Sequence, residues 1–229
     1  MAAKRRSKRK RAISENEVVL PVVTKGMVGG KYKPLSDHEI EQIHQTTLDV
    51  LENIGMTNPL PQFKEVALEQ GCNFTDQGRL CFPRSLVEDV IARAGRDFVM
   101  YGRDPKHDIE MSDKKVHLYG GGEAVTILDL GATTYRPSTI NDVYDIARVV
   151  DYLDNIHSYS RLVVATEFTD LLNTVINTAY ASVVGTTKHT ALTFASGKHV
   201  KPTIEMLEMI AGGEGKFLKR PFCHGGGCT

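Results

Sequence analysis

Residues 188–213 decide the fold, and they run KHTALTFASGKHVKPTIEMLEMIAGG. The first part, residues 189–194, is a short apolar run of the kind found in a buried strand. The second part, residues 199–211, carries apolar residues at helical spacing and ends at Gly212 and Gly213, which stop a helix. A strand that is followed, after a short loop, by a helix is the repeating unit of a parallel α/β sheet.

The same alternation extends on both sides of this unit. The sequence predicts strands at 116–119 and 157–164, helices at 140–153 and 170–184, and a further strand that starts at Pro221. Thr139 and Asp142 form a capping-box pattern at the start of the first of these helices. Because such strands pair in parallel with right-handed crossovers, we expect an α/β fold of the TIM-type (β/α)8 barrel class. Four strands are too few to close an eight-stranded barrel. We therefore expect residues 116–229 to form the first half of such a barrel, truncated before it closes.

The chain before residue 116 is organised differently. Residues 1–34 combine a basic run with several glycines and no sustained period, which predicts a disordered tail and linker. Residues 35–115 predict a small α+β cap region. Its expected elements are a helix opened by a capping box at Ser36 and Glu39 and stopped by Gly55, a helix at 60–70, a strand at 79–82, a helix opened by a capping box at Ser85 and Glu88, and a strand at 98–101.

Charge and cysteine content bound the functional class. The chain has 28 basic and 28 acidic residues, but residues 4–11 hold a dense basic cluster, so the remainder is mildly acidic. We expect this tail to be solvated rather than bound to nucleic acid. No secretory or membrane-spanning segment is recognisable, and the four cysteines without an export signal indicate reduced thiols. The sequence therefore predicts a cytoplasmic protein with no membrane partner.

Candidate site residues follow from barrel geometry, because the loops after the strands build the site in a parallel barrel. The loops after the predicted strands, together with nearby aromatic residues, give the candidate substrate-binding residues. They are Tyr119, Gly121, Gly122, Glu123, Arg161, Tyr180, Phe194 and His224. Glu123 would face a cationic substrate, and the aromatic rings would supply faces for a quaternary ammonium group. The alternative for the glycines is a tight turn without a ligand. No Ser-His-Asp pattern or carboxylate pair identifies a catalytic residue.

Nucleotide cofactors and metals are not expected. Glycines 120–122 lack the third glycine of the dinucleotide fingerprint, and Gly29-Gly30-Lys31 lacks the other residues of a Walker loop. Cys223, His224 and Cys228 have a spacing that suggests zinc. However, Cys223 and His224 are adjacent in a predicted strand and would point to opposite faces, so one ion cannot easily bind both.

Several stretches, taken together and in order, resemble the trimethylamine methyltransferase family. They are LSDHEIEQIH (35–44), VLENIG (50–55), RPST (136–139), VDYLDNIH (150–157), NTAYA (177–181), TKH (187–189) and RPF (220–222). The resemblance implies a TIM-type barrel enzyme that moves a methyl group from a methylated amine to the cobalt of a corrinoid (cobalamin) carried by a separate protein. By this resemblance, the amine would be trimethylamine or a quaternary amine such as glycine betaine.

The resemblance also sets the mechanistic expectations. Reduced cobalt would be the nucleophile, so this protein would hold the methyl carbon in line with cobalt and exclude water. The expected partners are a corrinoid protein, the methylated amine and, through the unclosed sheet edge, a second copy of the chain. Two alternatives stay open: a zinc- or thiol-dependent methyltransferase that uses Cys223 and Cys228, and a non-catalytic binding module with a basic arm.

Overall fold

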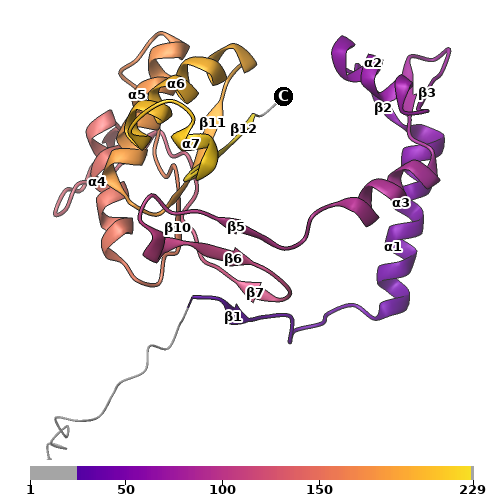
Figure 1. The fold of residues 1–229 in the computed structure, drawn as a ribbon, viewed down its shortest axis with the longest axis horizontal. Helices are drawn as coiled ribbons and strands as arrows, with labels where there is room; N and C mark the ends of the chain where they lie inside the picture. Colours follow the sequence, from indigo (N-terminus) through magenta and orange to yellow (C-terminus); the bar gives the residue numbers. More distant parts are fainter. Residues whose placement is uncertain (1–24, 228–229) are drawn as a thin grey trace, which may run out of the picture.

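The computed structural model describes residues 25–227, and its mixed α/β fold is organised around a three-stranded parallel sheet (Figure 1). The sheet contains, in chain order, β10 (Ser158–Ser160), β11 (His189–Phe194) and β12 (Cys223–Gly227). The central strand β11 pairs its His189 with Ser158 on one side and its Ala191 with His224 on the other. The predicted parallel pairing of successive strands is therefore confirmed, and β11 has the predicted bounds.

Residues 118–124 run alongside β10 without forming a regular strand. Tyr119 bridges to Ser158, and Ala124 bridges to Val163, both in the parallel sense. Between the two bridges lie the three glycines 120–122, which lack side chains to pack and weaken a strand interior. A fourth parallel segment therefore lies beside the sheet in an irregular form.

The strand predicted at 116–119 was wrong in its bounds. The regular strand here is β7 (Lys115–Val116), which pairs antiparallel with β1 (Met27–Val28) in the segment predicted as a linker. The 203 residues between 25 and 227 thus contain several small sheets and no closed barrel.

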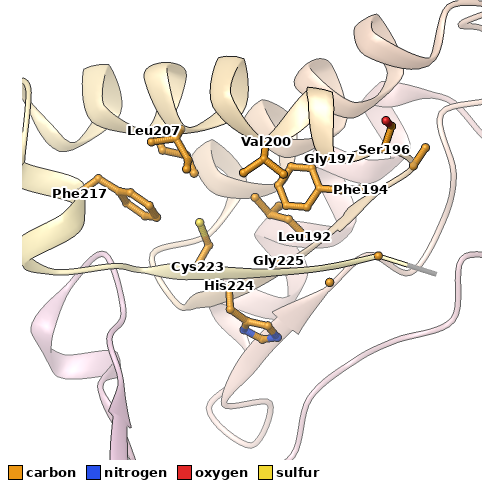
Figure 2. A pocket seen from close by; sticks show the side chains of 14 residues that line it. Leu192, Phe194, Ser196, Gly197, Val200, Leu207, Phe217, Cys223, His224 and Gly225 are labelled. Atoms are coloured by element: carbon orange, nitrogen blue, oxygen red, sulfur yellow. The ribbon is translucent and has the colours of Figure 1, made fainter. Parts of the chain in front are cut away.

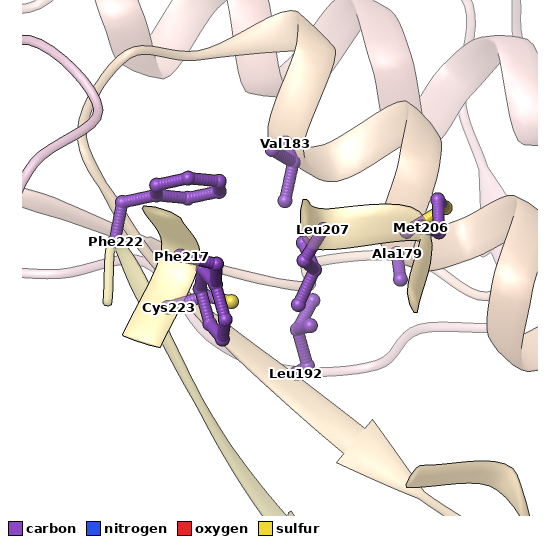
Figure 3. Packing of buried hydrophobic residues seen from close by; sticks show 8 residues of the cluster. All are labelled: Ala179, Val183, Leu192, Met206, Leu207, Phe217, Phe222 and Cys223. Atoms are coloured by element: carbon purple, nitrogen blue, oxygen red, sulfur yellow. The ribbon is translucent and has the colours of Figure 1, made fainter. Parts of the chain in front are cut away.

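Helices pack against one face of the parallel sheet. They are α4 (Ile140–Tyr152), α5 (Leu171–Gly185), α6 (Val200–Ala211) and the short α7 (Lys216–Lys219). The largest buried cluster joins α5, α6, α7, β11 and β12 (Figure 3), and it comprises Ala179, Val183, Leu192, Met206, Leu207, Phe217, Phe222 and Cys223. Burying one of its large apolar side chains stabilises the fold by about 1.5–3 kcal/mol.

The helix ends follow the local sequence. The capping box predicted at Thr139 and Asp142 is present at the start of α4, and the side chain of Asp170 caps α5. A 3-10 turn, η3 (Gly197–His199), leads into α6, which ends at Gly212 in the left-handed conformation that glycine adopts readily.

The helices α4 and α5 approach each other closely at Gly185. A Cβ atom at this position would lie 2.6 Å from the Cβ of Ala147 and 2.9 Å from the carbonyl oxygen of Tyr144. Real Cβ atoms do not come so near to their neighbours, so only glycine permits this helix contact.

The carbonyl groups at the end of α4 are bonded by a buried lysine. The ammonium of Lys188 donates hydrogen bonds to the carbonyls of Val150 and Leu153, both at 2.7 Å, and of Ile156, at 2.6 Å. Helix C-termini leave carbonyls without intrahelical partners and carry partial negative charge. Lys188 therefore joins the start of β11 to the end of α4.

An N-terminal unit contains α1 (Asp37–Asp49), a π-helical turn η1 (Val50–Ile54), α2 (Pro61–Glu69) and α3 (Arg84–Arg93). Its antiparallel sheet has the order β2 (Met56–Thr57), β4 (Arg79–Cys81), β3 (Asn73–Phe74). The capping box at Ser36 and Glu39 is confirmed, as is the stop at Gly55, where φ is +66°. The capping box predicted at Ser85 was wrong, because the N-cap of α3 is Pro83, two residues earlier.

Two hairpins connect the remaining parts. β5 (Phe98–Met100) pairs antiparallel with β6 (Ile109–Met111) across a 3-10 turn, η2 (Pro105–His107), and β8 (Thr126–Ile127) pairs with β9 (Arg136–Pro137). Figure 1 shows the β5–β6 hairpin lying between the N-terminal unit and the helices of the parallel sheet. None of the helices between residues 25 and 227 is long and apolar enough to span a membrane.

Candidate functional site

The face of the parallel sheet opposite the helices lines the candidate site. Residues alternate along each strand, so Cys223 points toward the helices whereas His224 points away from them (Figure 2). The predicted opposite orientation of these two residues is therefore confirmed. A cleft of about 660 Å³ lies on the His224 side. Its lining includes Tyr119, Ser158, Ser160, His189, Ala191 and His224, together with Phe98, Met100, Ile109 and Met111 of the β5–β6 hairpin.

Two histidines on neighbouring strands form a hydrogen-bonded pair in this cleft. Nε2 of His189 lies 2.9 Å from Nδ1 of His224, and Nδ1 of His189 lies 2.7 Å from the carbonyl oxygen of Tyr101. His189 is 4% exposed, whereas the ring of His224 is open to the cleft. Burial lowers the pKa of both histidines, and the neighbouring His224 lowers that of His189 further.

The position of Tyr101 is fixed by contacts on both sides of it. The guanidinium of Arg220 lies over the Tyr101 ring, 4.7 Å from its centroid, and pairs with the carboxylate of Asp108. Asp108 also accepts a hydrogen bond from the amide of Gly102 at 2.9 Å. These contacts hold the Tyr101 carbonyl against His189.

A second polar cluster lies at the carboxyl edge of the sheet. One oxygen of Glu123 accepts hydrogen bonds from Arg161 at 2.7 Å and from the Thr193 hydroxyl at 2.9 Å. Partial burial raises the pKa of Glu123, but the two hydrogen bonds and the charge of Arg161 outweigh burial and lower it overall. Glu123 has a φ of +61°, which is uncommon for a residue with a side chain and is found at functional sites as well as in turns.

The structure brings some of the predicted site residues together. Tyr119 and His224 line the cleft, and a Cβ built on Gly121 would contact the Tyr119 ring at 3.6 Å. A Cβ built on Gly122 would meet only the Leu162 carbonyl oxygen within 4 Å, at 3.7 Å. Glu123 and Arg161 are joined by their ion pair. Tyr119 and His224 therefore share the cleft, whereas Glu123 and Arg161 do not line it, and the carboxylate expected to face a cation already has a cationic partner.

Two other predicted residues lie elsewhere. Tyr180 is on α5 and 52% exposed, and it does not line the cleft. Phe194 points to the helix side, where its ring occupies the space that a side chain at Gly225 would need. Of the three aromatic faces predicted for an ammonium group, only that of Tyr119 lies in the cleft.

The helix side of the sheet holds a second, apolar cavity of about 390 Å³ (Figure 2). The thiol of Cys223 lies at its wall, and burial raises the pKa of this thiol to about 12. A buried thiol with so high a pKa is a poor nucleophile and metal ligand. Cys228 lies outside the described residues, and residues 25–227 contain no group of three His, Cys, Asp or Glu side chains that could hold a metal ion.

Sequence reasoning missed His189. It stands at the amino end of its strand, where barrel geometry predicts structural rather than catalytic residues. What brings it to the site is the register of β11 and β12, which pairs Ala191 with His224 and places His189 within hydrogen-bond distance of the His224 ring; a single sequence does not reveal this register. The weak indication available was that His189 and His224 both occur in predicted strands that follow each other.

Comparison with known proteins gives the family. The model of the trimethylamine methyltransferase (MTTB) family matches residues 2–226. The chain belongs to this family. The trimethylamine methyltransferase MttB of Desulfitobacterium hafniense strain DSM 10664 / DCB-2 is 33% identical over 187 residues, which cover 81% of this chain and 38% of that protein. The predicted resemblance is thereby confirmed.

Further relatives include enzymes that are named for two different amines. MttB of Methanosarcina thermophila is 25% identical over 183 residues, covering 78% of this chain and 38% of that protein. The glycine betaine methyltransferase of D. hafniense strain Y51 is 24% identical over 132 residues, covering 58% of this chain and 27% of that protein. The chain thus spans little more than a third of the length of the trimethylamine methyltransferases that it matches.

Proposed function

We propose that this chain forms part of a methyltransferase that moves a methyl group from a methylated amine to the cobalt of a corrinoid held by a separate protein. Membership of the trimethylamine methyltransferase family is the observation that carries the proposal. The relatives named for trimethylamine and for glycine betaine support a small methylated ammonium compound as the methyl donor. The cytoplasmic location expected from the sequence stays a prediction.

The fold that we propose for the whole enzyme is a TIM-type barrel. Three strands in chain order, each followed or preceded by a helix on the same side, support it, as does the parallel segment at 118–124. In such a barrel the face of the sheet away from the helices becomes the interior, and the carboxyl ends of the strands open onto the active site. The cleft that holds His224 would then belong to the barrel interior.

The residues of the cleft suit a small alkylated cation. The ring of Tyr119 offers an electron-rich face, and the apolar side chains of Phe98 and Met111 can contact methyl groups while they exclude water. Glu123, whose pKa is lowered, contributes a carboxylate at the edge of the sheet. Because Arg161 neutralises much of that charge, we assign attraction of the cation chiefly to Tyr119 rather than to Glu123.

A flat corrinoid would need some positions without side chains at the carboxyl edge of the sheet. Gly122 and Gly226 stand at the carboxyl ends of two parallel segments, and a Cβ on Gly226 would meet nothing within 4 Å. The glycine-rich edge therefore fits the approach of a macrocycle. When bound, the reduced corrinoid supplies the nucleophile that accepts the methyl group. This chain's own part is to orient the methyl group toward that edge and to keep water away.

Methyl transfer tests the proposal directly. The protein made from the complete coding sequence would be mixed with reduced cobalamin and either trimethylamine or glycine betaine, and methylation would be followed by cobalt absorbance. We expect transfer from at least one amine, and a Tyr119→Leu variant about tenfold lower in kcat/KM, since a cation–π contact contributes roughly 0.5–2 kcal/mol.

The matched control is Tyr152→Leu, which removes an 86% exposed tyrosine from α4 and should leave kcat/KM unchanged. Wild-type protein that demethylates neither amine would refute the proposed function. Equal loss in both tyrosine variants would instead refute the role of Tyr119.

A further inference from the structure

The histidine pair defines which nitrogen of His224 carries a proton. A backbone carbonyl can only accept a hydrogen bond, so the Nδ1 that faces Tyr101 must be the N–H of His189. In a neutral His189 the other nitrogen, Nε2, is then an acceptor. The Nδ1 of His224, 2.9 Å away, must therefore donate to it.

The remaining nitrogen of His224 is left as an acceptor. A neutral imidazole with its proton on Nδ1 has a lone pair on Nε2. No hydrogen bond joins this Nε2 to another group among residues 25–227, and the ring is open to the cleft. Free histidine populates both tautomers, whereas the hydrogen bonds that run from the Tyr101 carbonyl through His189 fix this one, as the hydrogen-bond partner of a metal-bound histidine does.

The cleft offers no second acceptor of this kind from a histidine. His117 also lines the cleft, and its Nε2 lies 3.1 Å from the carbonyl of Glu110. Its Nδ1 has no hydrogen-bond partner but is buried from solvent, so a ligand in the cleft cannot reach it. His224 therefore provides the accessible imidazole lone pair.

The walls around His224 select the ligand. Apolar and aromatic side chains favour a small cation with alkyl groups, and the lone pair favours a cation that also has an N–H. An alkylammonium ion titrates near pH 10, like lysine, so its proton stays on the amine when it meets a neutral imidazole. A quaternary ammonium ion has no N–H and makes no such bond.

We propose that His224 is the specificity-determining residue by which this cleft favours alkylammonium ions that carry an N–H over quaternary ammonium ions, and that His189 is the positioning residue that fixes its tautomer. This inference rests on the proposed function for the choice of ammonium ligands. A hydrogen bond from a charged donor makes binding of the N–H ion tighter by about tenfold or more.

The experiment uses the chain with ¹⁵N-labelled histidine, titrated at pH 7.5 with trimethylammonium chloride and, separately, with tetramethylammonium chloride. NMR gives the tautomer of His224 from its ring nitrogen shifts, and the same spectra give both Kd values. We expect the Nδ1–H tautomer, and trimethylammonium bound about tenfold more tightly than tetramethylammonium.

Four variants separate the roles. His224→Leu should make the two Kd values equal, and His38→Leu, an exposed histidine on α1, should leave their ratio unchanged. His189→Leu should release His224 to the Nε2–H tautomer and abolish the preference. His189→Gln should restore the preference, because its amide oxygen can accept the same hydrogen bond.

Each outcome either supports or overturns the specificity proposal for His224. An Nε2–H tautomer in the wild-type chain, equal Kd values, or a ratio that survives His224→Leu would overturn the specificity proposal and leave the proposed function standing. Binding of neither cation would count against both. A preference that depends on His224 and His189 would support the proposal even if the methyl-transfer assay failed.

Discussion

Replacement of Lys188 by methionine tests whether the buried ammonium holds β11 to α4. Lys188 is 2% exposed, and its three hydrogen bonds go to the carbonyls of Val150, Leu153 and Ile156. A buried acceptor left unbonded costs about 1–3 kcal/mol. Only the bond to Val150 is wholly buried, whereas those to Leu153 and Ile156 are part-buried, so water can replace some of the lost bonding.

The opposing effect is the desolvation of the ammonium. Burial lowers the pKa of Lys188, while Asp151 and Asp154 raise it, so the charged group carries a desolvation penalty that methionine would not have. The net loss of unfolding free energy is expected to be about 2–4 kcal/mol, less than three full hydrogen bonds would give. Methionine keeps most of the side-chain volume, which limits any cavity.

Urea unfolding followed by circular dichroism measures this loss, and amide hydrogen exchange in α4 shows where it acts. Lys201→Met is the matched control, because Lys201 is exposed on α6 and its replacement should change stability by less than about 0.5 kcal/mol. If Lys188→Met lost no more than the control, or if exchange in α4 did not accelerate, the carbonyl-bonding role would be refuted.

Three further predictions concern other contacts. Gly185→Ala should destabilise the chain by about 1–3 kcal/mol, because the added methyl meets Ala147 at 2.6 Å; an unchanged urea midpoint would contradict the close helix contact. Arg136 holds the pKa of Asp142 well below its usual range, so this carboxylate's stabilising contribution should be complete above about pH 5, begin to decline near pH 4 and be lost as the pH falls through the lowered pKa of the folded state. Asp142→Asn should therefore differ from wild type in urea midpoint less at pH 3 than at pH 6, and a constant difference would contradict the assignment. The Cys223 thiol, whose pKa is raised to about 12, should react with a disulfide reagent much more slowly in the folded chain than in urea; equal rates would show that it is accessible.

Local sequence patterns were enough to predict most elements. The capping boxes at Ser36 and Thr139 and the stop at Gly55 depend on residues close in the chain, and the structure contains all three. The error at Ser85 is local as well, because Pro83, whose ring fixes φ, is the N-cap and α3 begins at the next residue, Arg84. Patterns that act within one turn are readable from the sequence.

Pairing between distant segments was not readable in the same way. The strand predicted at 116–119 split, because Val116 pairs with Met27 while Tyr119 bridges to Ser158. Likewise, Tyr119 and His224 of the cleft were among the predicted residues, but the contact of His189 with His224 depends on the register between two strands. A single sequence specifies which residues share a face, not which partner they meet.

The helix α1 shows the same limit for burial. Its apolar residues recur at helical spacing, yet Ile40 and Ile43 are 53% and 56% exposed, whereas Leu48 is 1% exposed. The periodicity correctly predicted a helix with an apolar face. What covers such a face depends on tertiary packing, which periodicity does not describe.

The order of the parallel sheet has a consequence for synthesis on the ribosome. Within the sheet, β11 pairs with β10 and β12 pairs with β11, so each of these two strands finds its partner already synthesised. The sheet can therefore grow one strand at a time, with each new helix covering the strands already in place. At every stage the newest strand presents an unpaired edge, and translation pauses at such points would prolong the interval in which a nascent chain can associate with a neighbouring one.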